Sequence, residues 1–354
     1  MELDLQPVPD VFEAIRVDRA ADRPAPAPDA VDVAVLDMNH GWPNIGHDAI
    51  LLGIQTMAGE IQQELQTAGL RVRAISYDLR RGAGLPPLPD PNGDGGVTVG
   101  TGGPGHLDPR RNDGISEGSQ TIVEDPAWEA PFFAFLDAVR AHPTAALLGV
   151  CHTFGVMCRW LGVAEPVLRG PEKGGKSAGV LDNLLTPAAE RHPWFRRLVA
   201  ESPEGTRIRV LDNRLYDLIP RWGAVNGATI LSRETDGLGG PVGESLTMIE
   251  VARDPGGIMP RILAVNHHPE IVNHTRVLMV LWQKRARGEV SHEWYEERAR
   301  AMRQTLEDED SDRRLDLTSR YTFFEPLRFH LYRQIRLRAA RIGRPIALHE
   351  DRVL

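Results

Sequence analysis

The sequence predicts an α/β fold built on a mostly parallel sheet with helices on both faces. Residues 31–76 supply an apolar strand, an amphipathic helix and a second apolar strand, which is the β-α-β unit of parallel sheets. Two later apolar strands, at 97–99 and 145–150, each run directly into a glycine-rich loop or a sharp turn. The composition, 42% hydrophobic and 25% charged over 354 residues, allows one large globular domain with extensions.

The spacing of apolar residues and the positions of proline and glycine predict where each helix and strand begins and ends. Residues 20–30 alternate prolines with small residues, so residues 1–30 are expected to form a flexible N-terminal extension. The main domain should span 31–286, and the highly charged residues 287–354 should form a helical C-terminal extension. Strands are expected at 31–36, 71–76, 97–99, 145–150, 206–211, 228–232, 245–251 and 262–266, and helices at 47–68, 127–141, 152–161 and 270–287.

The C-terminal extension contains an amphipathic basic stretch. Leu327, Leu331 and Ile335 recur every four residues among several arginines, which gives one apolar helix face. Such a face can dock on the rest of the chain, on a partner or on an anionic surface, and docking on the chain itself is the favoured interpretation.

Composition also narrows the class of protein. The start of the chain lacks the basic and apolar segments of a secretory signal, so we expect a cytoplasmic protein, and no apolar run reaches the length of a membrane span. A net charge of −8 argues against a nucleic-acid partner. Cys151 and Cys158 are too few for a disulfide framework or a four-ligand zinc site, and no histidine spacing indicates a metal or another cofactor. Small-molecule chemistry is the remaining expectation.

Three loops at the carboxyl ends of predicted strands carry groups suited to thiol chemistry. They are the glycine run 102–105, the pair Cys151-His152, and the run 268–270, which reads His-Pro-Glu. Ligands of open α/β sheets bind at this edge, and together these loops offer backbone N–H donors, a nucleophile and a histidine beside a carboxylate. Taken singly, each has a structural alternative: a turn, a buried cysteine, and the start of a helix.

In combination, these motifs resemble the class I glutamine amidotransferase family. The family's elbow G-(I/V)-C-x-G-x-Q, oxyanion loop S-G-G-P and late F-H-P-E motif correspond to G-V-C-H-T-F-G, T-G-G-P and H-H-P-E here, in the same order. The resemblance covers about residues 31–286 and implies a flavodoxin-like sheet. It implies Cys151 as nucleophile, His268 as general base, Glu270 as its orienting carboxylate, the N–H groups of Gly103 and His152 as oxyanion hole, and Gly102, Thr153 and His267 as substrate-binding residues.

The implied reaction is hydrolysis of a side-chain amide, that of glutamine, through a cysteinyl thioester. Because no synthetase domain is recognisable in the chain, the ammonia would pass to a separate synthetase subunit. The acceptor of the ammonia or acyl group, the pathway, the oligomeric state and the role of the C-terminal extension stay open.

Departures from the family pattern keep other functions open. Thr153 replaces a glycine of the elbow, Gly155 replaces the glutamine that helps hold the substrate, and an insertion is expected between Arg169 and Gly257. The alternatives are a γ-glutamyl hydrolase or an acyltransferase of the same fold, or a non-catalytic regulatory subunit.

One further motif is interpreted as a coincidence. Residues 170–177 match the phosphate-loop pattern G-x-x-x-x-G-K-S, but no buried strand leads into them and no long helix can follow them.

Overall fold

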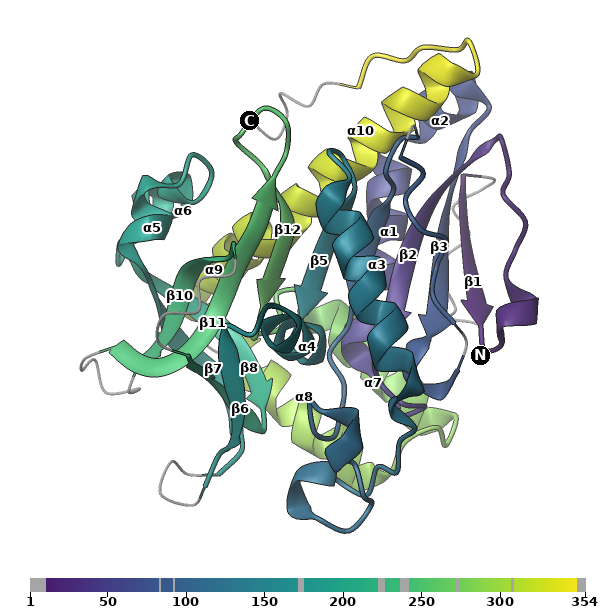
Figure 1. Ribbon diagram of the computed structural model, residues 1–354. Helices are drawn as coiled ribbons and strands as arrows, with labels where there is room; N and C mark the ends of the chain where they lie inside the picture. The colour runs from purple at the N-terminus through teal and green to yellow at the C-terminus, as the bar shows by residue number, and fades with distance from the viewer. Residues whose placement is uncertain are drawn as a thin grey trace.

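The structure, a computed structural model, describes residues 11–348 except 83, 92, 171–174, 222–226, 236–241, 272–273 and 307–308 (Figure 1). A ten-stranded sheet forms its centre, helices cover both faces, and a separate two-stranded sheet packs against β11. The expected α/β fold, with its mostly parallel sheet and helical C-terminal extension, is confirmed.

The strands are β1 (Phe12–Val17), β2 (Ala30–Asp37), β3 (Arg71–Asp78), β4 (Val97–Gly100), β5 (Ala146–Val150), β6 (Ala164–Leu168), β7 (Ser177–Leu185), β8 (Arg207–Arg214), β9 (Tyr216–Pro220), β10 (Thr229–Thr235), β11 (Val242–Arg253) and β12 (Pro260–Val265). The helices are α1 (Ile45–Glu60), α2 (Gln62–Ala68), α3 (Glu129–Ala141), α4 (His152–Leu161), α5 (Pro187–Arg191), α6 (Phe195–Glu201), α7 (His274–Ala286), α8 (His292–Leu306), α9 (Glu309–Ser319) and α10 (Glu325–Arg341), with a π-helical turn at Arg320–Phe324. No described helix is both long and apolar enough to span a bilayer.

The sheet has the order β1-β3-β2-β4-β5-β12-β11-β10-β7-β8. From β1 to β12 all neighbours are parallel, and from β12 to β8 all are antiparallel. The five strands β3-β2-β4-β5-β12 have the strand order of flavodoxin-like sheets. Because they are parallel, the loops that follow β2, β4, β5 and β12 meet at one edge, the lower edge in Figure 1.

Each face of the sheet has its own apolar core. Helices α1, α2 and α10 pack on one face, where Ile54 and Leu331 are fully buried against Val33. Helices α3 and α4 cover the other face with Phe132 and Met157. The chain interior is therefore a three-layer sandwich, with the carboxyl edge of the sheet left for a site.

The basic C-terminal helix belongs to the first of these cores. Leu327, Leu331 and Ile335 of α10 are all buried, so the favoured expectation, docking on the chain itself, is confirmed. Its charged face pairs with the body as well, since Arg328 of α10 forms an ion pair with Glu60 of α1.

The expected flexible N-terminal extension is wrong from residue 11 onward. Residues 12–17 form β1, which pairs in parallel with β3 at the edge of the sheet, and Val17 is fully buried. This short edge strand is stabilised by pairing with β3 and by the burial of Val11 and Val17. The proline-rich stretch that follows it in the sequence indicates neither the pairing nor the burial. Residues 1–10 lie outside the described residues.

The expected insertion extends the sheet. Strands β7, β8, β10 and β11 add the antiparallel half, and β6 pairs with β9 in the small second sheet. Ser177, the last residue of the phosphate-loop-like motif, begins β7 and donates its hydroxyl to Asp212 at 2.6 Å. A strand follows where a phosphate loop needs a helix, which confirms that the match is coincidental; residues 171–174 of that motif are not described.

Candidate active site

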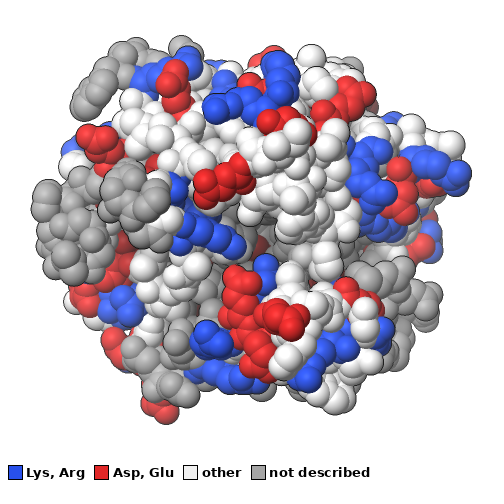
Figure 2. All heavy atoms as spheres, turned by 90° about the horizontal axis from the view of Figure 1, so that it is seen from below, with Lys and Arg blue, Asp and Glu red and all other residues white. Residues whose placement is uncertain are grey.

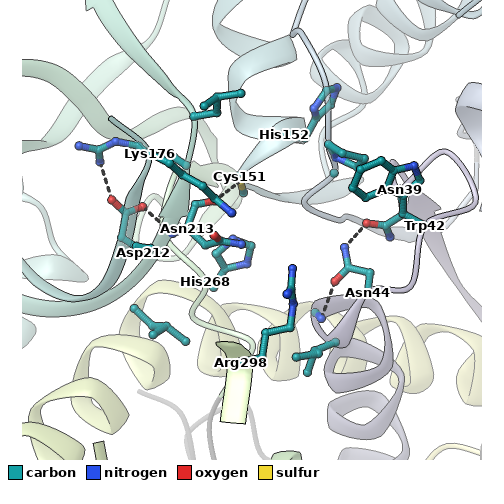
Figure 3. A pocket seen from close by; sticks show the side chains of 18 of the residues that line it. Asn39, Trp42, Asn44, Cys151, His152, Lys176, Asp212, Asn213, His268 and Arg298 are labelled. Atoms are coloured by element: carbon teal, nitrogen blue, oxygen red, sulfur yellow. Dashed lines mark hydrogen bonds and ion pairs between the residues drawn. The ribbon is translucent and has the colours of Figure 1, made fainter. Parts of the chain in front are cut away.

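Cys151 occupies a sharp turn between β5 and α4. Its backbone has φ +49° and ψ −99°, a conformation that residues with a Cβ rarely adopt, and its N–H donates to the Val265 carbonyl at 2.8 Å. This turn places the thiol at the amino end of α4 and in the wall of a cavity (Figure 3). Its Sγ is 3.9 Å from the Asn213 carbonyl, a weak contact that leaves the sulfur accessible from the cavity.

His268 and Glu270 follow β12, the strand next to β5. Nδ1 of His268 is 2.8 Å from Oε1 of Glu270, and only 1% of Glu270 is exposed. Since a carboxylate accepts, Nδ1 carries the proton of the neutral ring, and Nε2 is the nitrogen that gains or loses the second proton. Nε2 has no hydrogen-bond partner among the described residues. His268 and Cys151 line the same cavity, and both side chains lie against Gly102, so the ring is placed to exchange a proton with the thiol.

The charges around His268 favour its protonated form. Burial alone disfavours the imidazolium, but the charges of Glu270 and Cys151 outweigh this penalty and raise the pKa of His268 well above its usual value of 6.5. The ring and the sulfur are therefore electrostatically coupled, as a nucleophile and its base must be.

This raised pKa predicts a pH-dependent stability. Because the folded protein holds the His268 proton more tightly than the unfolded chain, the contribution is complete below the unfolded pKa of 6.5 and is lost as pH rises through the folded pKa. In urea unfolding from about pH 6 to about pH 9, the free energy of unfolding of the wild type should fall relative to that of a His268→Gln variant. A constant difference between the two proteins across this range would contradict the assigned coupling.

Gly103 and His152, the residues predicted to form an oxyanion hole, lie in the cavity wall with Cys151. Both line the cavity, and among the described residues no group accepts a hydrogen bond from either backbone N–H. A Cβ on Gly103 would collide with the Met38 carbonyl, so only glycine fits there. The His152 side chain is buried, and burial together with the charge of Arg80 lowers its pKa well below the usual value, which keeps the ring neutral.

Gly102 lies beside the side chains of Cys151 and His268 and is absent from the described lining of the cavity. A Cβ at this position would come within 3.0 Å of Cε1 of His268 and 3.7 Å of Sγ of Cys151. The expected substrate contact is therefore replaced by a packing role, in which Gly102 lets the two side chains approach each other.

Thr153, predicted to bind substrate, is buried and likewise absent from the described cavity wall. Its hydroxyl donates to the Thr101 carbonyl at 2.8 Å and fastens the elbow to the end of β4. Glycines make room for its methyl group: Gly100 and Gly149, paired across β4 and β5, both lie so near Thr153 Cγ2 that a Cβ on either would crowd it. The space that a glycine at position 153 would provide is thus provided here by Gly100 and Gly149 in the neighbouring strands.

Removing the Thr153 side chain should therefore destabilise the protein. Thr153→Val keeps the shape but loses the hydroxyl donor, at an expected cost of about 1 kcal/mol, and Thr153→Gly also leaves a void, for about 2–3 kcal/mol in total. Urea unfolding of both variants measures these costs. A Thr153→Gly protein more stable than the wild type would mean that the elbow is strained by threonine after all.

His267, also predicted to bind substrate, is absent from the described cavity wall. It is buried, and its Nε2 lies 3.4 Å from the hydroxyl of Thr322 in the π-helical turn. Burial lowers the pKa of His267 to about 3, so the ring is neutral. The contact with Thr322 places the His267 side chain against the C-terminal helices, whereas His268 lines the cavity.

Gly155 stands where the resembled family has its substrate-holding glutamine, and Leu107 takes up that space. A Cβ on Gly155 would collide with the Leu107 side chain, which itself lines the cavity. A glutamine side chain cannot occupy this position unless Leu107 moves. The second cysteine of α4, Cys158, is fully buried in the core, as expected.

The cavity has a volume of about 240 Å³ and opens at the carboxyl edge of the sheet. Figure 2 views this face from below Figure 1 and shows a hollow near its centre with acidic and basic side chains around it. Several lining residues were not expected from the sequence: Asn39, Trp42, Asn44, Lys176, Asp212, Asn213, Trp294, Glu297 and Arg298. Asn39 had a recognisable signal, a polar residue two positions after a buried strand, whereas Arg298 had none because it comes from α8 in the C-terminal extension.

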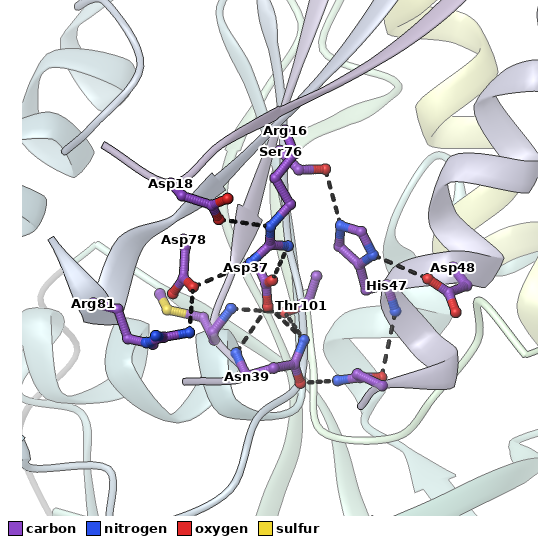
Figure 4. Close-up of polar contacts among 12 residues, drawn as sticks. Arg16, Asp18, Asp37, Asn39, His47, Asp48, Ser76, Asp78, Arg81 and Thr101 are labelled. Carbon is purple, nitrogen blue, oxygen red and sulfur yellow. Dashed lines mark hydrogen bonds and ion pairs between the residues drawn. The ribbon is translucent and has the colours of Figure 1, made fainter. Parts of the chain in front are cut away.

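A buried polar network holds the loop after β2 against this cavity (Figure 4). Arg16 of β1 bridges Asp37 at 2.6 Å and Asp78 at 3.1 Å, and Asp37 accepts the backbone N–H of Asn39 at 2.9 Å. The side chain of Asn44 donates to that of Asn39 and caps α1. Burial and the neighbouring Asp37 raise the pKa of Asp78. The N-terminal strand thus supplies the cation that makes two adjacent buried carboxylates tolerable.

The chain resembles known proteins in its three-dimensional structure but not detectably in its sequence. No protein-family profile and no curated protein sequence matches the chain. A glutamine amidotransferase from Thermotoga maritima is 14% identical, with a TM-score of 0.44 over 86% of this chain and 98% of its own. A candidate GMP synthase subunit from Thermoplasma acidophilum is 12% identical, with a TM-score of 0.37 over 78% and 98%. The glutaminase domain of Trypanosoma brucei CTPS with bound acivicin is 13% identical, with a TM-score of 0.42 over 68% and 87%. At these identities and TM-scores no activity can be transferred, and the function has to be inferred from the site itself.

Proposed function

We propose that the chain is a thiol amidohydrolase of the class I glutamine amidotransferase type, with Cys151, His268 and Glu270 as its catalytic triad. One observation carries the proposal: the ends of the neighbouring strands β5 and β12 direct a thiol on a strained elbow and a carboxylate-bound histidine into one cavity. A buried structural cysteine needs neither the positive φ angle nor a carboxylate-bound histidine beside it.

The proposed reaction begins with transfer of the Cys151 proton to Nε2 of His268. The sulfur attacks the side-chain amide carbon, and the N–H groups of Gly103 and His152 stabilise the oxygen that becomes negative. His268 returns the proton to the nitrogen and the C–N bond breaks. Ammonia is released, and the acyl group remains bound to Cys151 as a thioester. Water, deprotonated by His268, then attacks the thioester carbon; the C–S bond breaks, glutamate is released and the sulfur regains its proton.

We further propose that a separate synthetase uses the ammonia and that the reaction takes place in the cytoplasm. Both cysteines are free thiols, as a reducing compartment requires.

A γ-glutamyl hydrolase of the same fold is the second candidate. Leu107 fills the space beside Gly155, so this cavity lacks the expected contact for free glutamine, while its apolar wall, which includes Trp42 and Trp294, suits a larger amine group. In this alternative the same triad would cleave a γ-glutamyl amide whose nitrogen carries a substituent.

The two candidates separate in one experiment. The purified protein is incubated with glutamine and, separately, with γ-glutamyl p-nitroanilide, and glutamate and nitroaniline are quantified while the acyl-enzyme is trapped by acid and located by mass spectrometry. Glutamate from glutamine with a thioester on Cys151 supports the amidotransferase type; release of nitroaniline alone supports the second candidate. Absence of both products and of any acyl group on Cys151 would overturn the proposed function.

A further inference from the structure

Helix α8 of the C-terminal extension forms one wall of the Cys151 cavity. Four of its residues line the cavity, and Arg298 points into it from the side opposite the elbow (Figure 3). The guanidinium stacks over the Trp294 ring at 4.0 Å, and Nη1 donates to the Trp294 carbonyl at 3.3 Å. This stacking fixes the direction of the side chain, as a binding residue requires.

The charge of Arg298 is only partly compensated. Its ion-pair partner among the described residues is Glu297, whose side chain is 63% exposed and which contacts Nη1 alone, at 3.1 Å. The Arg298 side chain is 26% exposed, and burial lowers its pKa from the usual value. Nε and Nη2 form no hydrogen bond with a described residue, so one edge of the guanidinium fork is free to take two acceptor oxygens.

A second cation enters the cavity from β7's amino end. Lys176 is exposed, lines the cavity and forms no ion pair with a described residue (Figure 3). The mouth of the cavity is therefore attractive to an anion, while Glu297 beside Arg298 disfavours a doubly charged one such as a phosphate monoester. A carboxylate, with one charge and two oxygens in a plane, matches the free edge of the fork.

We infer that Arg298 is the carboxylate anchor of the substrate, so that the cavity selects amides of carboxylate-bearing amino acids by holding the acid on α8 and the amide carbon at Cys151. This inference rests on the proposed function and deepens it, since it assigns substrate selection to the C-terminal extension. It also gives that extension a role beyond packing, because α8 completes the cavity that the sheet loops leave open on one side.

The test compares glutamine with glutaminamide, in which a neutral amide replaces the α-carboxylate and γ-hydrolysis yields isoglutamine. Arg298→Gln should lower kcat/KM for glutamine by about 10–100-fold, mainly through KM, and leave that for glutaminamide nearly unchanged. Arg298→Lys should restore part of the preference for glutamine. Arg300→Gln is the matched control, because Arg300 is exposed on the same helix and does not line the cavity. An unchanged preference in Arg298→Gln, with α8 intact by circular dichroism, overturns the inference while leaving the proposed function in place.

Calorimetric binding of glutamate to the Cys151→Ala protein gives a readout without turnover. Adding Arg298→Gln should weaken this binding at least about tenfold, and adding Arg300→Gln should not. Binding that depends on Arg298 in a protein whose parent hydrolyses neither amide supports the anchor and refutes the proposed reaction. Equal glutamate binding with and without Arg298 refutes the anchor whatever the activity.

Discussion

Replacing Cys151 by alanine or by glycine is expected to abolish amide hydrolysis in both variants, while the glycine variant remains the more stable of the two. Loss of the nucleophile should reduce kcat by at least about 10⁴-fold, because the oxyanion donors and His268 have no thiolate to assist. Product assays at saturating amide, extended over hours, measure this residual rate.

The difference in stability follows from the backbone of the elbow. With φ at +49°, a Cβ at position 151 is strained, and alanine keeps that strain whereas glycine removes it. Strain of this kind costs roughly 1–3 kcal/mol. Glycine removes this cost, but it also stabilises the unfolded chain because it has more conformational entropy there, which offsets part of the gain. The free energy of unfolding of Cys151→Gly should therefore be about 1 kcal/mol higher than that of Cys151→Ala in urea unfolding. Equal stability would show that the elbow carries no strain to relieve.

Cys158 supplies the control for this experiment. It lies on the same helix, is fully buried, and burial raises its pKa, so it is neither accessible nor easily ionised. A diazoketone analogue of glutamine should therefore label the wild type once, at Cys151, and Cys158→Ala should be labelled at the wild-type rate. Labelling of Cys158, or full activity in Cys151→Ala, would remove Cys151 from the role of nucleophile.

The parts of the site that could be predicted from the sequence are those that follow a strand directly. A parallel strand fixes where its last residue lies, so Gly103 after β4, Cys151 after β5 and His268 after β12 had to meet at one edge once their strands were recognised. The contact of Glu270 with His268 could also be predicted, because the two residues are only two positions apart in the sequence.

The residues that could not be predicted depend on distant packing. Arg298 reaches the cavity only because α8 lies beneath the sheet edge against α7 and α9, and no local pattern states where a surface helix docks. In the sequence Thr153 is only a departure from the family elbow, and the pairing of β4 with β5 is what places Gly100 and Gly149 where they admit its methyl group. For β1, the signal was lost because an edge strand of six residues is stabilised mainly by its neighbour.

Glu270 is the second residue whose replacement should have a large effect, and its surroundings explain why. One carboxylate oxygen accepts from His268 at 2.8 Å, and the other is buried without a hydrogen-bond partner among the described residues. The amino end of α1 presses against the first oxygen, where a Cβ on Gly46 would collide with it. The negative carboxylate is thus held between the histidine and the positive end of a helix, with no room to turn away.

Glu270→Gln keeps this shape and removes the charge, so its effect should be on catalysis and on its pH dependence. The imidazolium that forms when His268 takes the thiol proton loses its counter-charge, and kcat should fall by about 10²–10⁴-fold. Burial lowers the pKa of His268, and the charge of Glu270 does most to raise it, so that pKa should fall in the variant and the alkaline limb of kcat/KM should move to lower pH. Glu289→Gln, which removes a partner of Lys284 outside the cavity wall, is the control and should leave both quantities unchanged. A Glu270→Gln enzyme with a reduced rate but an unshifted alkaline limb would mean that Glu270 only positions the ring, and that the charge stabilising the imidazolium comes from the Cys151 thiolate alone.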